Sequence, residues 1–406
     1  MEFTYTALDP RGARVQELLQ AADEDQAIRR LQDQGYVVLG LKASAQTTPG
    51  EAKKKAAPPS PGRVKQDHVV AMSRELAIMI ETGVPIADAL SLLAEHAENP
   101  VIKSTMVSTL ADVSEGKSLT ESISKHPKIF PKLYVSMIAS AEVGGTLHST
   151  LRQAAEYLEM SLDMRRKVRG ALTYPAVLVT AMTGVMIFMM VFLVPRFTEL
   201  FKHMGAKVPF TFTVMTMMSD FLRNDWWLVL IMIAGAIFGF RAFLKWPKGN
   251  AMFARTLLKI PMVGDTIKKV VMARTLRALS TLLDSGVSML VALDTVSQVA
   301  LNVVYEQAIM RARSQVEGGS SLTDAVTGAK VFPGMVCQMI AVGEKSGRLT
   351  SVLMHVAHYY EREVDARLKS LATIIEPVMI VVLGIMVGVI AVSIFSPLYS
   401  IYDNIK

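Results

Sequence analysis

The chain has 406 residues, of which 51% are apolar and 19% are charged, and its mean hydropathy is +0.34. This composition excludes an ordinary soluble protein and favours a membrane protein that also carries soluble parts. The net charge of +7 is typical of basic segments that flank membrane spans, so we do not expect a nucleic-acid partner. The single cysteine, Cys337, excludes an intramolecular disulfide framework, and we expect no cleavable signal peptide.

Residues 1–43 predict a small α/β unit. Phe3, Tyr5 and Ala7 alternate with polar residues, which indicates a strand, and a second and a third β-rich run follow. Between them lies a short amphipathic stretch around Ala27 that predicts a helix. Residues 44–65 are rich in Ala, Pro and Lys, have almost nothing to bury, and predict a linker.

Two long parts of the remaining chain repeat each other. Residues 81–85, ETGVP, return as residues 284–288, DSGVS, and the correspondence continues with one residue lost. The matched pairs include Gly83 and Gly286, Glu142 and Glu344, Gly145 and Gly347, and Pro175 and Pro377. A register held over so many positions indicates an internal duplication, and a duplication of helical units favours a scaffold.

Each repeat predicts a bundle of six short helices. In the first repeat, residues 72–80 place apolar side chains at helical spacing, and Gly83 ends that helix. Ser118, followed by Glu121, is typical of a capping box that opens a later helix. Residues 66–169 and 269–370 are the two predicted bundles.

Three stretches are long and apolar enough to cross a bilayer. Residues 170–194 carry no charge, residues 226–244 begin with two tryptophans, and residues 374–402 contain a second long uncharged run. Basic clusters lie before the first span, after the second and before the third. The positive-inside rule places all three clusters in the cytoplasm, so both bundles would be cytoplasmic and would share one orientation, as parallel repeats do.

The expected fold is therefore an all-α polytopic membrane protein with two repeated cytoplasmic six-helix bundles, three transmembrane helices and a small N-terminal α/β unit. The N-terminus would be cytoplasmic and the C-terminus periplasmic. The remaining expected segments are a periplasmic segment at 195–225, a cytoplasmic connector at 245–268 and a periplasmic tail at 403–406.

The order and spacing of the motifs resemble the GspF/PilC family of inner-membrane platform proteins, which serve type II secretion and type IV pilus machines. Residues 81–85 are similar to one family element, and residues 115–119, EGKSL, to another. Residues 341–349, AVGEKSGRL, are close to the family signature, and residues 139–147 are a looser copy.

This resemblance implies a non-enzymatic platform without a cofactor, in the bacterial inner membrane. Its partners would be a hexameric cytoplasmic assembly ATPase, pilins or pseudopilins, and other inner-membrane proteins of the same machine, together with the lipid bilayer. The internal duplication also predicts a homodimer or a small even oligomer. Members of the type II secretion branch hold calcium on an acidic cluster. Glu98 and Glu156 match two of its positions, but the third is Arg152 here, which argues against a metal.

Several residues are candidates for contacts with partners or for organising loops. Glu142 and Glu344 each precede a glycine-containing break, where a carboxylate could contact a partner or cap the next helix. The other candidates are Gly83, Gly145, Gly286 and Gly347. In the spans, Pro175 and Pro377 mark where a helix can begin or kink, and Glu376 is either a functional carboxylate or one at headgroup depth.

Other chemistries fit the sequence less well. Gly116-Lys117-Ser118 suggests a phosphate-binding loop, but Ala111 stands where that motif needs glycine. His355 and His358 could chelate a metal, yet their surroundings indicate a solvated face. Two alternatives to a platform remain. A small membrane transporter subunit would need polar groups for a binding site at the membrane midplane, and the spans lack them. An intramembrane processing enzyme would need paired carboxylates or a set of metal ligands, which the spans also lack.

Overall fold

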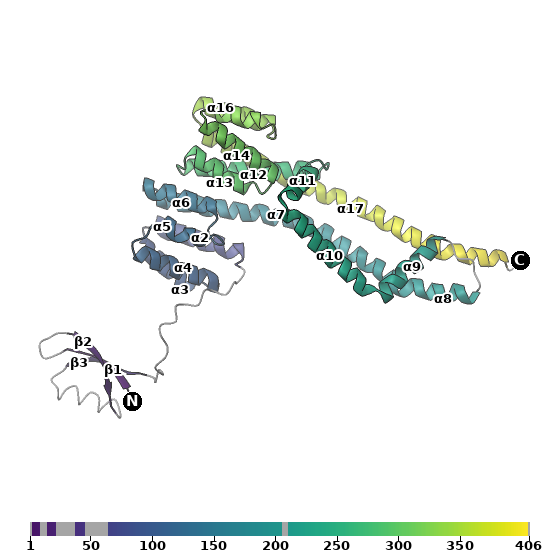
Figure 1. Cartoon of the computed structure of the whole chain (residues 1–406), viewed down its shortest axis with the longest axis horizontal. Helices are drawn as coiled ribbons and strands as arrows, with labels where there is room; N and C mark the ends of the chain where they lie inside the picture. Colours follow the sequence, from purple (N-terminus) through teal and green to yellow (C-terminus); the bar gives the residue numbers. More distant parts are fainter. Residues whose placement is uncertain (1, 9–13, 22–36, 45–63, 205–209, 405–406) are drawn as a thin grey trace. The chain divides into compact units, whose positions relative to one another are not determined.

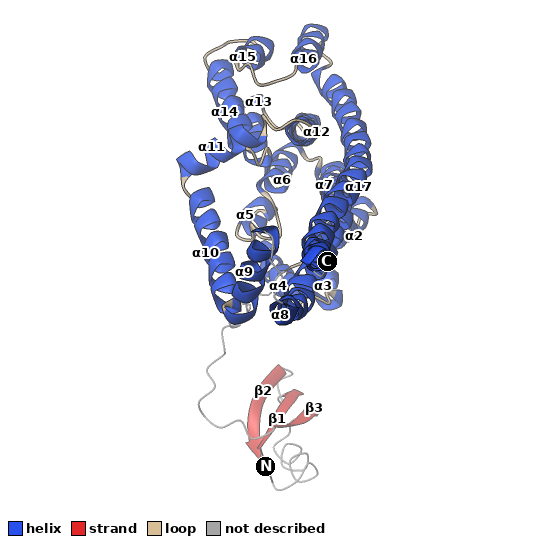
Figure 2. Cartoon of the chain, turned by 90° about the vertical axis from the view of Figure 1, so that its right-hand side faces the viewer, coloured by secondary structure: helices blue, strands red, loops and turns tan. Residues whose placement is uncertain are grey.

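The computed structural model describes residues 2–8, 14–21, 37–44, 64–204 and 210–404. It divides into two compact units, residues 1–62 and residues 63–406. In the first unit, β1 (Glu2–Leu8) pairs in antiparallel register with β2 (Arg14–Gln20) and with β3 (Val37–Ser44), in the order β2-β1-β3. Figure 2 shows this small sheet in red. The helix expected around Ala27 lies outside the described residues, so the α/β character of this unit is not supported.

The first repeat consists of the helices predicted from its apolar spacing. They are α2 (Gln66–Glu81), α3 (Ile86–His96), α4 (Pro100–Ser114), α5 (Leu119–Ser124), α6 (Lys132–Gly144) and α7 (Leu147–Phe188). Local sequence sets their ends. Asn99 caps α4 from the position before Pro100, and the Ser118 hydroxyl accepts the Glu121 N–H at 3.0 Å, as half of the predicted capping box.

The second repeat forms the same series of helices. They are α12 (Val263–Asp284), α13 (Met289–Val299), α14 (Val303–Glu317), α15 (Leu322–Gly328), α16 (Gly334–Ser346) and α17 (Leu349–Asn404). One continuous hydrophobic core joins both bundles and includes Met137 and Leu151 of the first and Leu282 and Val364 of the second. The two repeats are therefore packed together as one body within the second unit.

Three helices in the described ranges are long and apolar enough to cross a membrane. They lie within Leu147–His203, Trp226–Lys245 and Leu349–Ser393. The sixth helix of each bundle is continuous with its span, since α7 and α17 run on into the apolar stretches without a break (Figure 1). Pro175 and Pro377 lie inside these helices, so neither proline begins a helix, and of the two expectations a kink is the one that stays a prediction. Losing one backbone donor does not end a long helix whose other hydrogen bonds remain.

Between the first and third spans the chain turns back toward the bundles. After the π-helical turn η1 (Met189–Leu193), α8 (Val194–Met204) and α9 (Phe210–Asn224) lie at the far end of the long helices (Figure 1). They pack with α17 around a second apolar cluster that contains Phe201, Phe212 and Ile390. Then α10 (Trp226–Lys245) and α11 (Pro247–Leu257) return the chain to the second bundle (Figure 1). The middle span thus brings both bundles to the same end of the long helices.

Candidate functional site: the two bundles and the contact between them

Glu142 and Glu344 make the same contact in the two repeats. The Glu142 carboxylate accepts the backbone N–H groups of Leu119 at 2.5 Å and Thr120 at 3.1 Å, at the N-terminus of α5. In the second repeat, the Glu344 carboxylate accepts the N–H groups of Leu322 at 2.9 Å and Thr323 at 3.0 Å. Each carboxylate therefore caps a helix more than twenty residues earlier in the chain. The expectation that it caps the next helix is wrong, because the fold brings the end of α6 or α16 over the start of α5 or α15.

The pKa of Glu344 reflects these hydrogen bonds. Partial burial would raise the pKa of this carboxyl group, but the Thr323 hydroxyl and the two backbone N–H groups stabilise the ionised form and lower it below the ordinary value. The Thr323 Oγ1 donates at 2.6 Å. The negative charge also lies at the positive end of a helix, where it is favoured.

The glycines that follow these helices adopt conformations that other residues avoid. Gly145 and Gly347 end α6 and α16 with φ values of 68° and 67°. Gly286, in the loop after α12, has a φ of 78°, and a side chain built there would meet the Ser140 hydroxyl of the first bundle at 3.4 Å. The loop glycines thus fix the turns, and Gly286 also lies at the contact between the repeats.

The tip of α7 contacts the loop after α12. The Gln153 amide donates to the Asp284 carboxylate at 2.7 Å, and the Ser285 hydroxyl donates to the Gln153 side-chain oxygen at 2.7 Å. A pocket of about 600 Å³ next to these side chains is lined by both loops, including Thr146 and Gly286. The first bundle thus contacts the second through the end of α6 and the start of α7.

Helix α6 also contacts α13. The Lys132 ammonium group lies 2.6 Å from the Asp294 carboxylate, and the hydroxyls of Ser136 and Thr295 are 3.3 Å apart. Thr295 is fully buried. These polar contacts border the shared apolar core, so they orient the two bundles while burial supplies most of the stabilisation.

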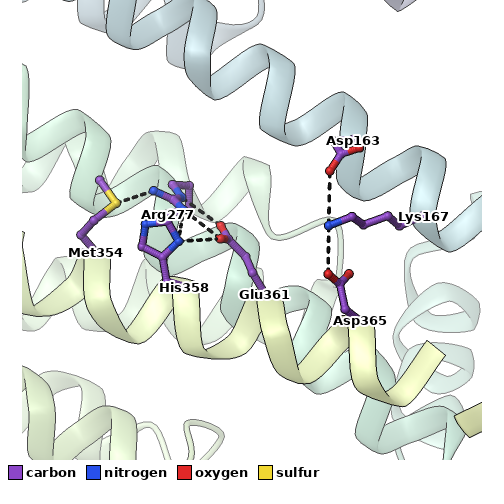
Figure 3. A network of polar contacts seen from close by, with 7 residues as sticks. All are labelled: Asp163, Lys167, Arg277, Met354, His358, Glu361 and Asp365. Atoms are coloured by element: carbon purple, nitrogen blue, oxygen red, sulfur yellow. Dashed lines mark hydrogen bonds and ion pairs between the residues drawn. The ribbon is translucent and has the colours of Figure 1, made fainter. Parts of the chain in front are cut away.

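An ion pair between buried Arg277 and partly buried Glu361 joins α12 to α17 within the second bundle (Figure 3). The Arg277 guanidinium donates to both carboxylate oxygens of Glu361, at 2.9 and 2.8 Å, and also contacts Met354 and His358. The His358 Nδ1 lies 3.1 Å from Glu361, so His358 contacts this network from the surface. His355 and His358 are both exposed, in agreement with the predicted solvated face.

Sequence reasoning missed this ion pair, although the repeat contained its signal. Arg74 and Glu159 occupy the equivalent positions in the first repeat and also pair, at 3.2 Å. That first pair is exposed, whereas Arg277 is buried and Glu361 is partly buried. A charge pair that recurs in both copies of a repeat can be detected in the sequence, but only packing determines which copy is buried.

The helices that lead to the membrane are joined by Lys167. Its ammonium group lies 2.9 Å from Asp365 of α17 and 3.3 Å from Asp163 of α7, which are equivalent positions in the two repeats (Figure 3). The hydrogen bond to Asp365 raises the pKa of Lys167 above its ordinary value. Lys167 thus holds α7 beside α17 at the base of the bundles.

The residues considered for calcium are arranged differently. Arg152 lies 3.5 Å from Glu156 and 3.9 Å from Glu81, so the arginine neutralises the acidic side chains around it. Within the described ranges, no three His, Cys, Asp or Glu side chains group closely enough to hold a metal. Lys117 of the glycine-lysine-serine motif pairs with Asp112 and Glu115 between two helices. In the third span, Glu376 is exposed on α17 beside Pro377.

Comparison with known proteins identifies the family. The family described as "Type II secretion system (T2SS), protein F" matches residues 72–195 and 275–397, which are the two repeats. The chain belongs to the type II secretion system protein F family. The N-terminal domain of the same family matches residues 1–42, and the resemblance inferred from the motifs is confirmed.

The relatives of this chain in the protein F family carry names from two machines. A type IV pilus assembly protein PilC from Thermus thermophilus is 34% identical over 100% of this chain and 99% of its own length. A PilC from Pseudomonas aeruginosa is 34% identical over 84% of the chain and 91% of its own length. A type II secretion system protein F from Vibrio cholerae is 29% identical over 98% of the chain and 97% of its own. These are names of assembly proteins, and with the three apolar helices they indicate an inner-membrane protein.

Proposed function

We propose that this chain is the inner-membrane platform of a type IV filament machine, coupling a cytoplasmic assembly ATPase to the insertion of pilin or pseudopilin subunits into a growing filament. The names of its relatives support both type IV pilus biogenesis and type II secretion. In this role the chain catalyses no reaction. The hexameric ATPase supplies the energy, and other inner-membrane proteins of the machine complete the assembly.

The observation that carries this proposal is the continuity of α7 and α17. Each helix begins in a bundle, contributes to the shared core, and then runs on as an apolar span. A helix held by its backbone hydrogen bonds transmits a displacement along its axis, whereas a flexible linker absorbs it. A motor that moves the bundles would therefore move the membrane helices with them.

The charge distribution supports a cytoplasmic position for the bundles. Arg165, Arg166 and Lys167 precede the first span, and Arg367 and Lys369 precede the third. Such clusters remain on the cytoplasmic side, where an ATPase is available, and the C-terminus then lies in the periplasm. The spans and the α8–α9 end would face the subunits that enter the filament from the membrane.

The experiment that tests this proposal interrupts the helices between the bundles and the membrane. Gly-Ser-Gly-Ser is inserted between Arg169 and Gly170 of α7, and in a second variant between Lys369 and Ser370 of α17. The matched control carries the same insertion after Ala57, in the linker predicted from sequence. Each full-length variant is extracted in detergent and purified, and the amount of assembly ATPase from the same genome that it retains is measured. In cells, the amount of filament or of secreted substrate is measured.

We expect all variants to reach the membrane and to retain the ATPase, while only the insertions in α7 and α17 abolish filament assembly. Normal assembly by both helix variants would contradict the coupling role. Failure of every protein, including the unmodified chain, to retain any assembly ATPase would contradict the proposed partner. No observation on the described residues favours the transporter or the intramembrane enzyme.

A further inference from the structure

A cavity of about 340 Å³ lies between the two bundles. The first bundle contributes the start of α2, the loop before α6 and the middle of α7, and the second contributes α12 and the end of α13. Its volume is in the range of sites that hold small ligands. A molecule bound here would touch both repeats at once.

The charged side chains that line this cavity have one sign. They are Lys128, Lys132, Arg165 and Arg274, and none of the described lining residues is Asp or Glu. Lys132 already pairs with Asp294, and Arg165 donates only to the neutral amide oxygen of Gln66, at 2.7 Å. Within the described ranges, the other cations of the cavity form no ion pair. The cavity therefore carries positive charge that the fold does not neutralise.

Arg274 shows this most clearly. It is half-buried on α12, three residues before Arg277, which pairs with Glu361. No described side chain pairs with Arg274 or accepts a hydrogen bond from it. Burial and the nearby charge of Arg165 lower the pKa of Arg274, because both disfavour its charged form. The equivalent residue of the first repeat is Ala71, so the duplicated fold does not need an arginine at this position.

Tyr157 places a hydroxyl donor among these cations. Its side chain is only 8% exposed and lines the cavity, and its hydroxyl has no hydrogen-bond partner among the described residues. Burial raises the pKa of Tyr157 to about 12, so the hydroxyl stays protonated and can donate. The charges of Arg274 and Arg165 both act on this hydroxyl, so the three groups surround one part of the cavity. A buried donor without an acceptor is costly unless a ligand supplies one.

The chemistry of these groups selects the ligand. Guanidinium and ammonium groups and a protonated phenol are all donors, and they converge without an acceptor among them. A guanidinium binds two oxygens of a phosphate group at once, and a phosphate monoester carries nearly two negative charges at neutral pH. Val69, Val299 and Leu301 also line the cavity and provide an apolar wall for the rest of such a molecule.

We propose that this cavity binds a small phosphate-bearing ligand, with the guanidinium groups of Arg274 and Arg165 on the phosphate oxygens and the Tyr157 hydroxyl as a further donor. Arg165 lies shortly before the uncharged run that begins at Gly170. A soluble phosphate ester and a phospholipid headgroup are therefore both sources of this chemistry. Because the ligand touches both bundles, its binding stabilises the joint between them. This inference rests on the cavity and not on the filament function.

Equilibrium dialysis of radiolabelled pyrophosphate against the full-length protein in detergent tests the site, at a constant chloride concentration of about 100 mM that screens diffuse attraction. Arg274→Gln and Tyr157→Phe each remove one proposed donor. Arg311→Gln is the matched control, since Arg311 is exposed on α14 and does not line the cavity.

We expect the unmodified chain to bind pyrophosphate saturably. Arg274→Gln should weaken binding about tenfold, because it removes a charge-assisted pair of hydrogen bonds, and Tyr157→Phe about threefold. Arg311→Gln should leave binding unchanged. Equal weakening by Arg274→Gln and Arg311→Gln would overturn the proposal, because it would show attraction by net charge alone.

A lipid arm distinguishes the two sources. The chain is reconstituted in nanodiscs of phosphatidylcholine, with or without phosphatidylglycerol, and dialysis is repeated. Unchanged pyrophosphate binding in both would assign a soluble ligand, whereas displacement by phosphatidylglycerol would assign the headgroup. Absence of saturable pyrophosphate binding in detergent and in both nanodiscs would overturn the site. Equal displacement by triglutamate would overturn the phosphate class in favour of carboxylates.

Thermal unfolding separates binding from a structural role of Arg274. Without pyrophosphate, Arg274→Gln should not lower the melting temperature, because it removes a cation that has no partner in the described part of the chain. With pyrophosphate, the melting temperature of the unmodified chain should rise, and that of Arg274→Gln should rise less. A lower melting temperature of Arg274→Gln without the probe, together with an undiminished rise on adding it, would show that Arg274 supports the fold and not a ligand.

Discussion

The Glu344 carboxylate accepts the backbone N–H of Leu322 at 2.9 Å, so the end of α16 caps the start of α15. Glu142 makes the same contact with Leu119 in the first repeat. The duplicated glutamate thus closes each bundle by satisfying N–H groups that a short helix cannot pair within itself. A partner could still contact these residues, but their capping role is sufficient to explain why the repeat contains them.

Replacing Glu344 with alanine should destabilise the second bundle by about 1 kcal/mol, which is typical for the loss of a helix cap. The free energy of unfolding in detergent, followed by circular dichroism, measures the effect. Glu75→Ala, at an exposed position in the middle of α2, is the matched control and should change stability by less than about 0.5 kcal/mol. Equal effects of the two substitutions would contradict the capping role.

The same substitution should have a pH-dependent effect. The pKa of Glu344 is lowered in the folded chain, so its stabilisation is complete above the unfolded value of about 4.3 and is lost as pH falls through the folded value. The stability difference between the unmodified chain and Glu344→Ala should therefore be constant from pH 6 to pH 7 and shrink in acid. A difference that grows as the pH falls would have the wrong sign.

Removing Arg277 should cost more than removing its equivalent in the first repeat. Arg277→Met leaves the partly buried Glu361 carboxylate without its cation, and we expect a loss of about 3 kcal/mol. Arg74→Met removes the exposed pair with Glu159 and should cost less than about 1 kcal/mol. Denaturation in detergent compares the two. Adding Glu361→Met to Arg277→Met should recover most of the lost stability. If the double variant recovers none of it, the loss comes from changed packing and not from the unpaired carboxylate.

A side chain at Gly286 should disturb the contact between the bundles as well as the local turn. Gly286 and Gly319 have φ values of 78° and 89°, so valine at either position is strained by about 1–2 kcal/mol. Only at Gly286 would the added atoms also approach Ser140 of the other bundle. Gly286→Val should therefore lower the melting temperature further than Gly319→Val. It should also block filament assembly while the protein remains in the membrane.

The pairing of the bundles can be captured covalently. With Cys337→Ser, the double variant Ser136→Cys and Thr295→Cys should form a disulfide within one chain after oxidation, because the parent hydroxyls are 3.3 Å apart. Mass spectrometry of the digested protein identifies the linked peptides, and each single variant is the control. Absence of the link in a folded, oxidised sample would show that α6 and α13 are not neighbours.

The sequence alone determined most of the helices, several of their ends and the three long apolar stretches. Apolar spacing produced the two bundles, Asn99 and Ser118 began helices through their own side chains, and long uncharged runs defined the membrane segments. All of these features depend on residues close together in the chain. The duplication was equally visible, because it is a comparison of the chain with itself.

The tertiary structure decided what the duplication left open. Two copies of one bundle carry the same two faces, so the sequence pattern is the same for every way of pairing them. Packing placed α6 and the start of α7 against α13 and the loop after α12. This contact buries Thr295, while the equivalent residue of the first repeat, Leu92, stays exposed. It also buried Arg277 beside a partly buried Glu361, while the equivalent pair stayed in solvent. It brought Glu142 over a helix that begins more than twenty residues earlier in the chain. These outcomes depend on which surfaces exclude water together, and that is a property of the assembled fold.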